Sequence, residues 1–398
     1  MMENSNEPDG GMPDILRKRP EVHPTGLPTI AIVSFSTLST GGIETHLLQL
    51  FRGLGSEFEF IILGAMEEPF RSLARERGAQ SVRLPQAGKL DPAALLRLRR
   101  EFLARHIQLV HTHDTRGGMI GRLAARAAGV KAVHTVHTPS FFLPRNPAAV
   151  GLYRLAERML NRTASDRVIF VSRTIRRIYL DGRLVQPSKA TLIPNGLEPV
   201  WFDATARKKR VDREVRFLYV GRLAREKGME NLAEAFGIVA AQIPDALLHV
   251  AGEGPGRETL AQTAQRGGWA GRLELHGRIS RDAARDLMHA SDVFVLPSRF
   301  ESFSYTLLEA MACGLPCIAT DVGGNRDLIE PERNGLLTPK ENPAELAAAM
   351  VRLANDPNGR ASMGQAGAEM AREYTLARMI DGTRSVYRQV LGISSDPT

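Results

Sequence analysis

The chain has 398 residues, of which 43% are hydrophobic and 24% are charged, a balance typical of a soluble globular protein. It contains no run of about 18 apolar residues, so the sequence predicts no transmembrane helix, and its polar N-terminus lacks the apolar core of a signal peptide. Only two cysteines are present, which excludes a disulfide framework. We therefore expect a cytoplasmic protein.

The net charge of +8 is unevenly distributed along the chain. Residues 28–195 carry 24 basic and 12 acidic side chains, whereas residues 196–398 carry 25 basic and 27 acidic side chains. The excess positive charge favours an anionic partner for the first half, such as a membrane surface, an acidic glycan or a nucleic acid. We expect no nucleic acid, because only 6% of residues are aromatic and the basic segments lack interleaved aromatic side chains. Peripheral contact with an anionic membrane remains a hypothesis.

The first half of the chain alternates apolar runs with amphipathic stretches. We interpret residues 1–27 as a disordered tail. The predicted strands are 29–35, 58–64, 107–113, 132–137 and 167–172, and the predicted helices are 45–54, 69–77, 92–106, 118–129 and 149–163. Strands that alternate with helices predict a mostly parallel sheet with helices on both faces.

The same alternation begins again in the second half, after a break near 193–202 and a charged segment at 206–214. The predicted strands are 215–221, 246–252, 272–277, 292–298 and 316–321, with helices between them and a terminal helix at 374–391. The fold class is therefore α/β, with two doubly wound domains at 28–195 and 196–375, then a C-terminal segment at 376–398. Ligands of such sheets bind at the carboxyl ends of the strands.

Two segments of the first half allow two interpretations each. The helix predicted at 92–106 is apolar on one side and carries Arg97, Arg100 and Arg105 on the other. It either packs on the sheet with a solvated basic face or faces a membrane. Residues 141–143 either cover the core or contact a lipid acceptor. The apolar side of the helix comprises Leu95, Leu96, Leu98, Phe102 and Leu103.

Glycines and cations follow the first strand of each half. Gly41 and Gly42 open a helix, so its free N–H groups can approach a phosphate or a substrate hydroxyl; the alternative is an ordinary turn. Arg222 and Lys227 lie on the loop after the strand at 215–221. Two cations beside a helix N-terminus suit a diphosphate leaving group, and the alternative is a solvated charged loop.

The segment 298–324 carries two glutamates eight residues apart, Glu301 and Glu309. Residues 302–304 include two serines that can cap a helix running to Cys313, with Gly314 after its end. If the spacing were helical throughout, the glutamates would lie about 12 Å apart along the axis. That separation suits the two ends of an elongated ligand better than a hydrolytic carboxylate pair, and the alternative is two surface glutamates.

Four histidines, His111, His113, His134 and His137, lie on neighbouring segments, where a metal site is conceivable. No cysteine or glutamate stands at ligand spacing beside them, and the sequence has no D-x-D to clamp a metal-bound diphosphate. We therefore predict no metal and no cofactor. The cysteines, Cys313 and Cys317, are interpreted as small buried residues.

Taken together, these motifs resemble the GT-B-fold retaining glycosyltransferases of family 4 (glycosyl transferases group 1), which use nucleotide-sugar donors. The resemblance covers about residues 29–390 and implies two Rossmann-like domains facing across a cleft, with a C-terminal helix that crosses back to the first domain. It rests on the order and spacing of GGIE, HTHD, TVHT, IPNG, VGRLAREKG, GEGP and E-x7-E, followed by AMACGLP and DVGG.

The resemblance also implies roles for single residues. Arg222 and Lys227 would bind the donor diphosphate, Glu309 the ribose hydroxyls, and Glu301 the hydroxyls of the transferred sugar. His137 would contact that sugar. The catalytic residues would be His137, Glu301, Arg222 and Lys227.

The remaining implied contacts involve the backbone. The amides of Phe303 and Ser304 would touch the sugar or the distal phosphate, and Gly42 would approach from the other domain. The loop of Gly277, Arg278 and Ile279 would flank the base. This chain has Ser302 and Ser304 where many members carry glycine.

The implied reaction moves a hexose-type sugar from a UDP- or GDP-sugar to an acceptor hydroxyl. From the positive charge of the first half, we expect the acceptor to be a lipid-linked or cell-envelope saccharide, in lipopolysaccharide or exopolysaccharide biosynthesis. The reaction would retain the anomeric configuration, need no metal and take place in the cytoplasm or at the inner face of the membrane. Two alternatives remain: a non-catalytic nucleotide-sugar-responsive binding protein, and a sugar-nucleotide hydrolase or epimerase on the same scaffold.

Overall fold

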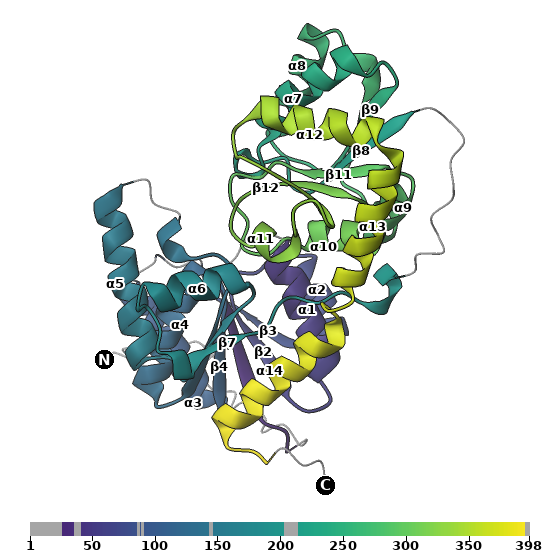
Figure 1. Cartoon of the computed structure of the whole chain (residues 1–398). Helices are drawn as coiled ribbons and strands as arrows, with labels where there is room; N and C mark the ends of the chain where they lie inside the picture. Colours follow the sequence, from purple (N-terminus) through teal and green to yellow (C-terminus); the bar gives the residue numbers. More distant parts are fainter. Residues whose placement is uncertain are drawn as a thin grey trace, which may run out of the picture.

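The computed structural model describes residues 26–35, 41–85, 88, 91–142, 146–202 and 214–394. Within these ranges the chain forms two α/β domains, each built on one parallel sheet (Figure 1). This arrangement confirms the predicted fold class. The charged segment predicted at 206–214 lies outside the described residues except for Glu214.

The first domain contains a seven-stranded parallel sheet in the order β3-β2-β1-β4-β5-β6-β7. Apolar side chains point to both faces: Ile30 and Ile32 join one core cluster, whereas Ala31 and Val33 join another. A strand buried on both faces reads as a continuous apolar run, which is why the sequence predicted it clearly. The strands are β1 (Thr29–Ser34), β2 (Glu59–Gly64), β3 (Gln80–Arg83), β4 (Leu109–Thr112), β5 (Lys131–Val136), β6 (Arg167–Phe170) and β7 (Ala190–Leu192).

In the described part of this domain, six α-helices connect and cover these strands. The fourth begins earlier than predicted because the Asp114 carboxylate accepts a hydrogen bond from the Gly117 N–H and caps the first turn. The helices are α1 (Gly42–Leu54), α2 (Phe70–Glu76), α3 (Pro92–Ala104), α4 (Thr115–Ala128), α5 (Pro147–Thr163) and α6 (Arg173–Asp181).

The second domain contains a six-stranded parallel sheet in the order β10-β9-β8-β11-β12-β13. Its strands are β8 (Val215–Val220), β9 (Ala246–Ala251), β10 (Leu273–Gly277), β11 (Val293–Leu296), β12 (Cys317–Thr320) and β13 (Gly335–Thr338). Its helices are α7 (Met229–Gln242), α8 (Gly256–Arg266), α9 (Arg281–His289), α10 (Tyr305–Ala312), α11 (Asn325–Leu328), α12 (Pro343–Asn355) and α13 (Pro357–Ala371).

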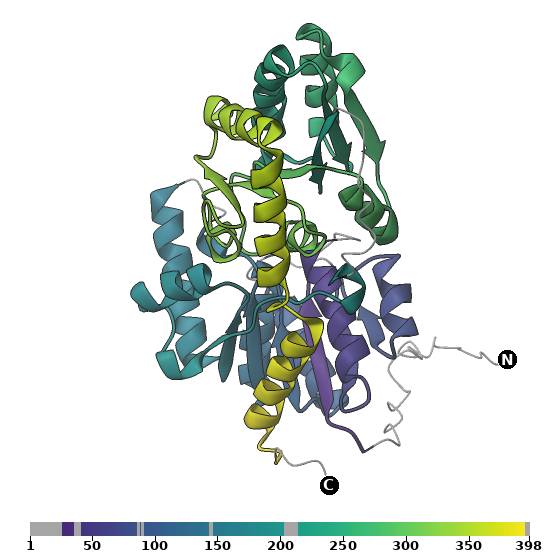
Figure 2. The same ribbon diagram turned by 45° about the vertical axis from the view of Figure 1, so that its right-hand side comes forward.

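The last helix, α14 (Leu376–Leu391), returns to the first domain (Figure 2). Its buried residues Met379, Ile380, Val386 and Tyr387 join the core cluster that contains β1 and β2. The phenol of Tyr387 lies 2.6 Å from a ring nitrogen of His111. This packing confirms that the C-terminal helix crosses back to brace the first domain.

Three strands were not predicted: β3, β7 and β13. They contain only three or four residues each and lie at sheet edges. β3 and β7 are largely half-buried, so their apolar pattern is weaker than that of the equally short but fully buried β4. The helix at 92–106 is confirmed, but Leu96 and Leu103 do not pack with Leu98 and Phe102, because they are 55% and 45% exposed.

Within the segment 141–143, Phe141 matches the interpretation that the segment covers the core. Phe141 is buried in a core cluster with Tyr179. Phe142 is 40% exposed and its ring lies 4.8 Å from that of Phe300 in the second domain. Leu143 lies outside the described residues.

Candidate functional site

The two domains meet where α1 and α10 begin. Each of these helices starts a few residues after a strand, α1 after β1 and α10 after β11. A Cβ added at Gly42 would lie 3.7 Å from the Tyr305 ring, and the Tyr305 hydroxyl donates to Gln49 Oε1 at 3.1 Å. The carboxyl ends of the two sheets are therefore turned toward each other at this contact.

Lys227 and Glu301 form a close ion pair. Lys227 Nζ lies 2.5 Å from Glu301 Oε1, and the same oxygen accepts a hydrogen bond from Ser298 Oγ at 2.8 Å. The side chains are 21% and 8% exposed, so the pair is mostly screened from water. The loop after β8 and the loop after β11 thus bring opposite charges together across 74 residues of sequence.

The backbone around Glu301 explains the glycines of the DVGG sequence. The Gly324 N–H donates to the Glu301 carbonyl at 2.9 Å. A Cβ on Gly323 would come within 1.8 Å of that carbonyl, and Gly323 also has a positive φ of 45°. Only glycine fits so close to another backbone, so this turn fixes the position of Glu301.

The helix α10 begins at Tyr305, with Ser304 as its N-cap accepting from the Leu307 N–H. The predicted cap is therefore confirmed at Ser304, and Gly314 follows the end of the helix with a φ of 73°. Because the helix begins only at residue 305, Glu309 lies little more than one turn inside it, and the spacing of the two glutamates is not helical throughout. The N–H groups at Phe303 and Ser304 precede the first turn.

Arg222 lies on the loop after β8 but does not contact Glu301. Its guanidinium pairs with Glu226 at 2.6 Å, and both side chains are about half exposed. The Tyr219 hydroxyl donates to the Arg222 carbonyl at 2.8 Å and fixes the backbone there. Among the described residues the guanidinium is therefore held by a surface pair, which is weak enough to be exchanged for a ligand.

Glu309 belongs to a chain of charges that links the domains. Its carboxylate lies 3.2 Å from Arg281, which also pairs with Glu198 at 2.9 Å, and Glu198 pairs with Arg52 of α1 at 2.8 Å. Burial raises the pKa of Glu309, and the Arg281 charge opposes that rise. Arg281, Glu198 and Arg52 were not singled out in the sequence, because no local pattern shows that they meet.

Gly277 ends β10 with a φ of 68°, and its carbonyl accepts from the Gly252 N–H at 2.7 Å. Arg278 and Ile279 follow it and lead into α9. In the sheet order, β10 and β11 are three positions apart. At about 4.8 Å per strand, the loops after them are separated by roughly 14 Å, the scale of an elongated ligand.

The histidines of the first domain separate into two sets. The two ring nitrogens of His111 lie 2.6 Å from the Tyr387 hydroxyl and 2.7 Å from Thr135 Oγ1, and a His134 nitrogen lies 2.8 Å from Thr112 Oγ1. These two side chains are held inside the fold.

His113 and His137 form the other set together with His46, which the sequence reasoning missed. His113 Nδ1 lies 3.0 Å from His137 Nε2, and His46 Nδ1 lies 2.9 Å from Asn195 Oδ1. The three residues place ring nitrogens within 4.8 Å of one another, close enough for one cation. His46 Nε2 and His113 Nε2 are buried and have no hydrogen-bond partner among the described residues. The one available signal was that His46 lies one turn into the helix opened by the glycine pair.

Burial keeps this histidine set neutral. It lowers the pKa of His46 to about 4, against a rise caused by Asn195, and it lowers the pKa of His113 and His137 well below the usual range. The positive charge that any one of them would carry also opposes protonation of the others. At neutral pH the rings can therefore donate or accept hydrogen bonds without adding charge.

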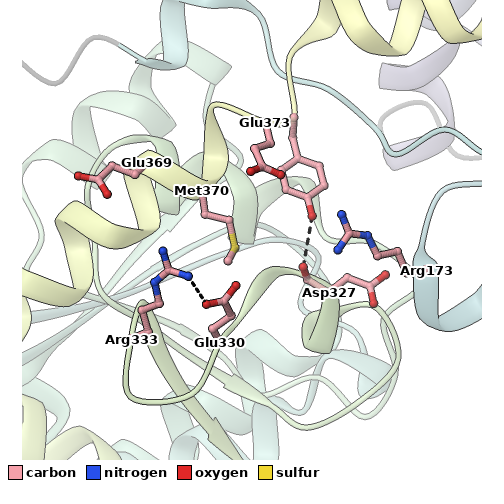
Figure 3. A pocket seen from close by; sticks show the side chains of 8 residues that line it. Arg173, Asp327, Glu330, Arg333, Glu369, Met370 and Glu373 are labelled. Carbon is pink, nitrogen blue, oxygen red and sulfur yellow. Dashed lines mark hydrogen bonds and ion pairs between the residues drawn. The ribbon is translucent and has the colours of Figure 1, made fainter.

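A second junction between the domains contains a cavity of about 440 Å³ (Figure 3). Asp327 of α11 accepts hydrogen bonds there from the N–H and hydroxyl of Thr174 in α6. The cavity contains none of the predicted site residues, so we assign it to the domain contact. It is lined by Arg173, Asp327, Glu330, Arg333, Glu369, Met370, Glu373 and Tyr374.

Two family models match the chain. The model described as Glycosyltransferase Family 4 matches residues 40–200, and the model described as Glycosyl transferases group 1 matches residues 203–370. Their boundary falls between the two sheets, so each model covers one domain.

Curated relatives agree with these matches. The UDP-Gal:alpha-D-GlcNAc-diphosphoundecaprenol alpha-1,3-galactosyltransferase of Escherichia coli is 28% identical over 75% of this chain and 79% of its own length. The alpha-D-kanosaminyltransferase of Streptomyces kanamyceticus is 28% identical over 74% of this chain and 79% of its own.

Solved structures share the fold. Sucrose-phosphate synthase from Thermosynechococcus elongatus has a TM-score of 0.77 at 25% identity and covers 92% of this chain and 100% of its own. Anabaena HepE in complex with UDP has a TM-score of 0.74 at 19% identity and covers 91% of this chain and 100% of its own, a likeness of fold.

Proposed function

The chain belongs to the family 4 glycosyltransferases of the GT-B fold and is a glycosyltransferase, and on that premise we propose which sugar transfer it carries out. The donor is a UDP- or GDP-linked hexose, and the acceptor is a hydroxyl of a lipid-linked or cell-envelope saccharide. The configuration at the anomeric carbon is retained, and the reaction itself uses no metal or cofactor.

The observation that carries this proposal is the Lys227–Glu301 pair beside the first turn of α10. A cation, an anion and the N–H groups at the start of a helix within one small region match the groups of a sugar diphosphate: phosphate oxygens, sugar hydroxyls and a leaving oxygen. In the absence of donor, Glu301 neutralises Lys227. On binding, the diphosphate takes over that charge and Glu301 accepts from sugar hydroxyls instead.

The donor is proposed to extend along the carboxyl ends of the second sheet. Gly277, Arg278 and Ile279 flank the base, and Glu309 holds the ribose. The ion pair of Glu309 with Arg281 supports this order, because α9 begins two residues after Ile279. The diphosphate then lies at Arg222 and Lys227, and the sugar lies at Glu301.

Charge separation is the main task of the proposed reaction. The diphosphate departs with developing negative charge, which Arg222, Lys227 and the α10 N-terminus stabilise. The acceptor hydroxyl attacks from the same face, and the departing phosphate oxygen takes its proton. His46 Nε2 and His113 Nε2 are buried without a partner among the described residues, and His137 lies beside them. As a donor or an acceptor, either nitrogen can bind a sugar hydroxyl. Closure of the domains, with Gly42 against α10, excludes water and so limits hydrolysis.

A surface of the first domain supports a lipid-linked acceptor. Along α5, Leu152, Leu155 and Met159 are 66%, 55% and 58% exposed, and their spacing places them on one face of the helix. Arg154, Arg158 and Arg162 lie on the same helix. An exposed apolar stripe beside arginines suits an anionic bilayer. The Escherichia coli relative is named for a diphosphoundecaprenol substrate. No helix in the described part of the chain could span a membrane.

The proposal is tested by thermal stabilisation of the purified chain with UDP-, GDP- and ADP-sugars, followed by transfer assays with polyprenyl-diphosphate saccharides in the presence of a chelator. We expect one UDP- or GDP-hexose to raise the melting temperature and to be consumed only with acceptor. Release of free sugar at the full rate without acceptor would indicate a hydrolase. Donor binding without turnover across the acceptor panel would indicate a binding protein.

A further inference from the structure

A second histidine cluster lies on the sheet of the second domain, outside the proposed donor site. It consists of His249 on β9 together with Glu274 and His276 on β10, and it is defined here as the edge cluster. Glu274 stands directly opposite His249 in the parallel ladder. The register then shifts between Leu275 and Gly277, so His276 is the extra residue of a β-bulge. A bulge redirects a side chain, and here the His276 ring stacks on that of His249 at 5.3 Å and 14°.

Three ligand atoms converge in the edge cluster. His249 Nδ1 lies 3.1 Å from His276 Nε2 and 3.2 Å from Glu274 Oε2, and the last two atoms are 3.8 Å apart. The nearest point equidistant from all three atoms lies in their plane, about 2.0 Å from each, as follows from these three separations. Bonds from zinc to histidine nitrogen and carboxylate oxygen are about 2.0–2.2 Å long.

Hydrogen bonds alone account poorly for the close approach of these three atoms. His249 Nδ1 carries at most one hydrogen, yet it lies within hydrogen-bond distance of both an imidazole nitrogen and a carboxylate oxygen. A divalent cation at the common point would receive a lone pair from all three atoms at once. The carboxylate would also offset part of the cation charge, which two neutral imidazoles do not.

The partial exposure of the edge cluster leaves room for water to bind the same cation. The His249 side chain is 8% exposed, whereas those of His276 and Glu274 are 28% and 56% exposed. One ligand is thus anchored in the sheet and two reach the surface, so water can complete the coordination shell. Two imidazoles and one carboxylate are ligands that zinc and its neighbours in the first transition row accept.

We propose that His249, Glu274 and His276 bind a zinc-type divalent cation at the β9–β10 edge. The site lies apart from the reacting groups and ties the outermost strand to its neighbour. His276 directly precedes Gly277, so bound metal also restrains the end of β10, where the Gly277 carbonyl accepts from Gly252. The proposal does not depend on the identity of the donor or acceptor.

The experiment titrates the chelator-treated full chain with zinc chloride by calorimetry, and with cobalt chloride by visible absorption. The variants are His276→Ala and Glu274→Gln, whose side chains are partly exposed, so the fold is expected to persist. His106→Ala, at an exposed histidine of the first domain, is the matched control. His137→Ala separates the edge cluster from the His46, His113 and His137 set.

We expect one equivalent of zinc to bind to the wild type and to the His106 and His137 variants. Affinity should fall more than tenfold in His276→Ala and Glu274→Gln, since loss of a ligand should cost at least the ~10–100-fold that loss of a supporting contact costs. Zinc should also slow amide exchange at residues 273–277 in the wild type, but not in His276→Ala or Glu274→Gln. Any of three results would overturn the proposal: unchanged zinc affinity in His276→Ala, loss of the bound equivalent of zinc in His137→Ala, or no zinc binding to the wild type.

Discussion

Lys227 Nζ lies 2.5 Å from Glu301 Oε1, although the two residues follow different strands, β8 and β11. Among the described residues, neither side chain forms another ion pair as close, and both are mostly buried. Each therefore holds the other in place, in the position where the proposed donor would place its diphosphate and its sugar.

Removal of the Lys227 ammonium should impair turnover. For Lys227→Ala we expect kcat to fall by about 10²–10³-fold, because one preorganised charge no longer stabilises the leaving diphosphate. Arg225→Ala is the control, since Arg225 is an exposed cation on the same 3-10 turn. Steady-state kinetics with the donor found in the panel measure both. Equal turnover in Lys227→Ala and the wild type would remove Lys227 from the proposed mechanism.

Loss of the Glu309 carboxylate should weaken donor binding at least tenfold, because a hydrogen-bonded ribose would lose its acceptor. Glu198→Ala is the comparison, since Glu198 shares Arg281 with Glu309 but lies outside the proposed site. Donor dissociation constants for Glu309→Ala and Glu198→Ala distinguish the two roles. If both variants lose affinity equally, Glu309 acts only by holding Arg281.

Acid should destabilise the first domain through His46. Its native pKa of about 4 lies below the unfolded value of 6.5, so the native state binds fewer protons and stability falls as the pH drops from 6.5 to 4. His46 alone should account for roughly 3 kcal/mol over that range. Urea unfolding of wild type and His46→Gln at several pH values tests this. The variant should show the shallower pH dependence, and parallel curves would contradict the assignment.

The buried pair Arg122–Glu157 should matter more for stability than any exposed pair. Its side chains are 0% and 5% exposed and lie 3.2 Å apart. Glu157→Ala leaves the Arg122 charge buried with only neutral partners, which typically costs about 3–5 kcal/mol. Asp181→Ala breaks an exposed pair with Arg177 and should change the unfolding midpoint little. Chemical denaturation of both variants checks the contrast, which fails if the two midpoints shift alike.

The exposed stripe on α5 should bind anionic vesicles. Replacing Leu152 and Leu155 by glutamate removes apolar area and adds charge that the lipid repels, so co-sedimentation with phosphatidylglycerol vesicles should fall several-fold. Ile238→Glu is the control, because Ile238 is an exposed apolar residue of the second domain. Donor binding should be unaffected in all variants. Undiminished sedimentation of the double variant would exclude α5 as the membrane contact.

The two-domain parallel architecture could be predicted because doubly buried strands leave long apolar runs between amphipathic helices. The cap at Ser304 and the turn at Gly314 could be predicted too, since both depend on neighbours in sequence. Short edge strands such as β3 could not, because the four residues of β3, three half-buried and one exposed, carry little periodicity. The sequence also did not reveal which apolar side chains of a helix stay exposed, as Leu96 and Leu103 on α3 show.

The sequence alone determined which residue types follow each strand, including the glycine pair, Lys227 and Glu301, because these depend on order along the chain. Only the tertiary structure decided which of them meet. It paired Lys227 with Glu301, connected Glu309 to the first domain through Arg281, and brought His46 to His113 and His137. Such contacts join residues dozens of positions apart, and the packing of helices and sheets, not any local pattern, sets their distances.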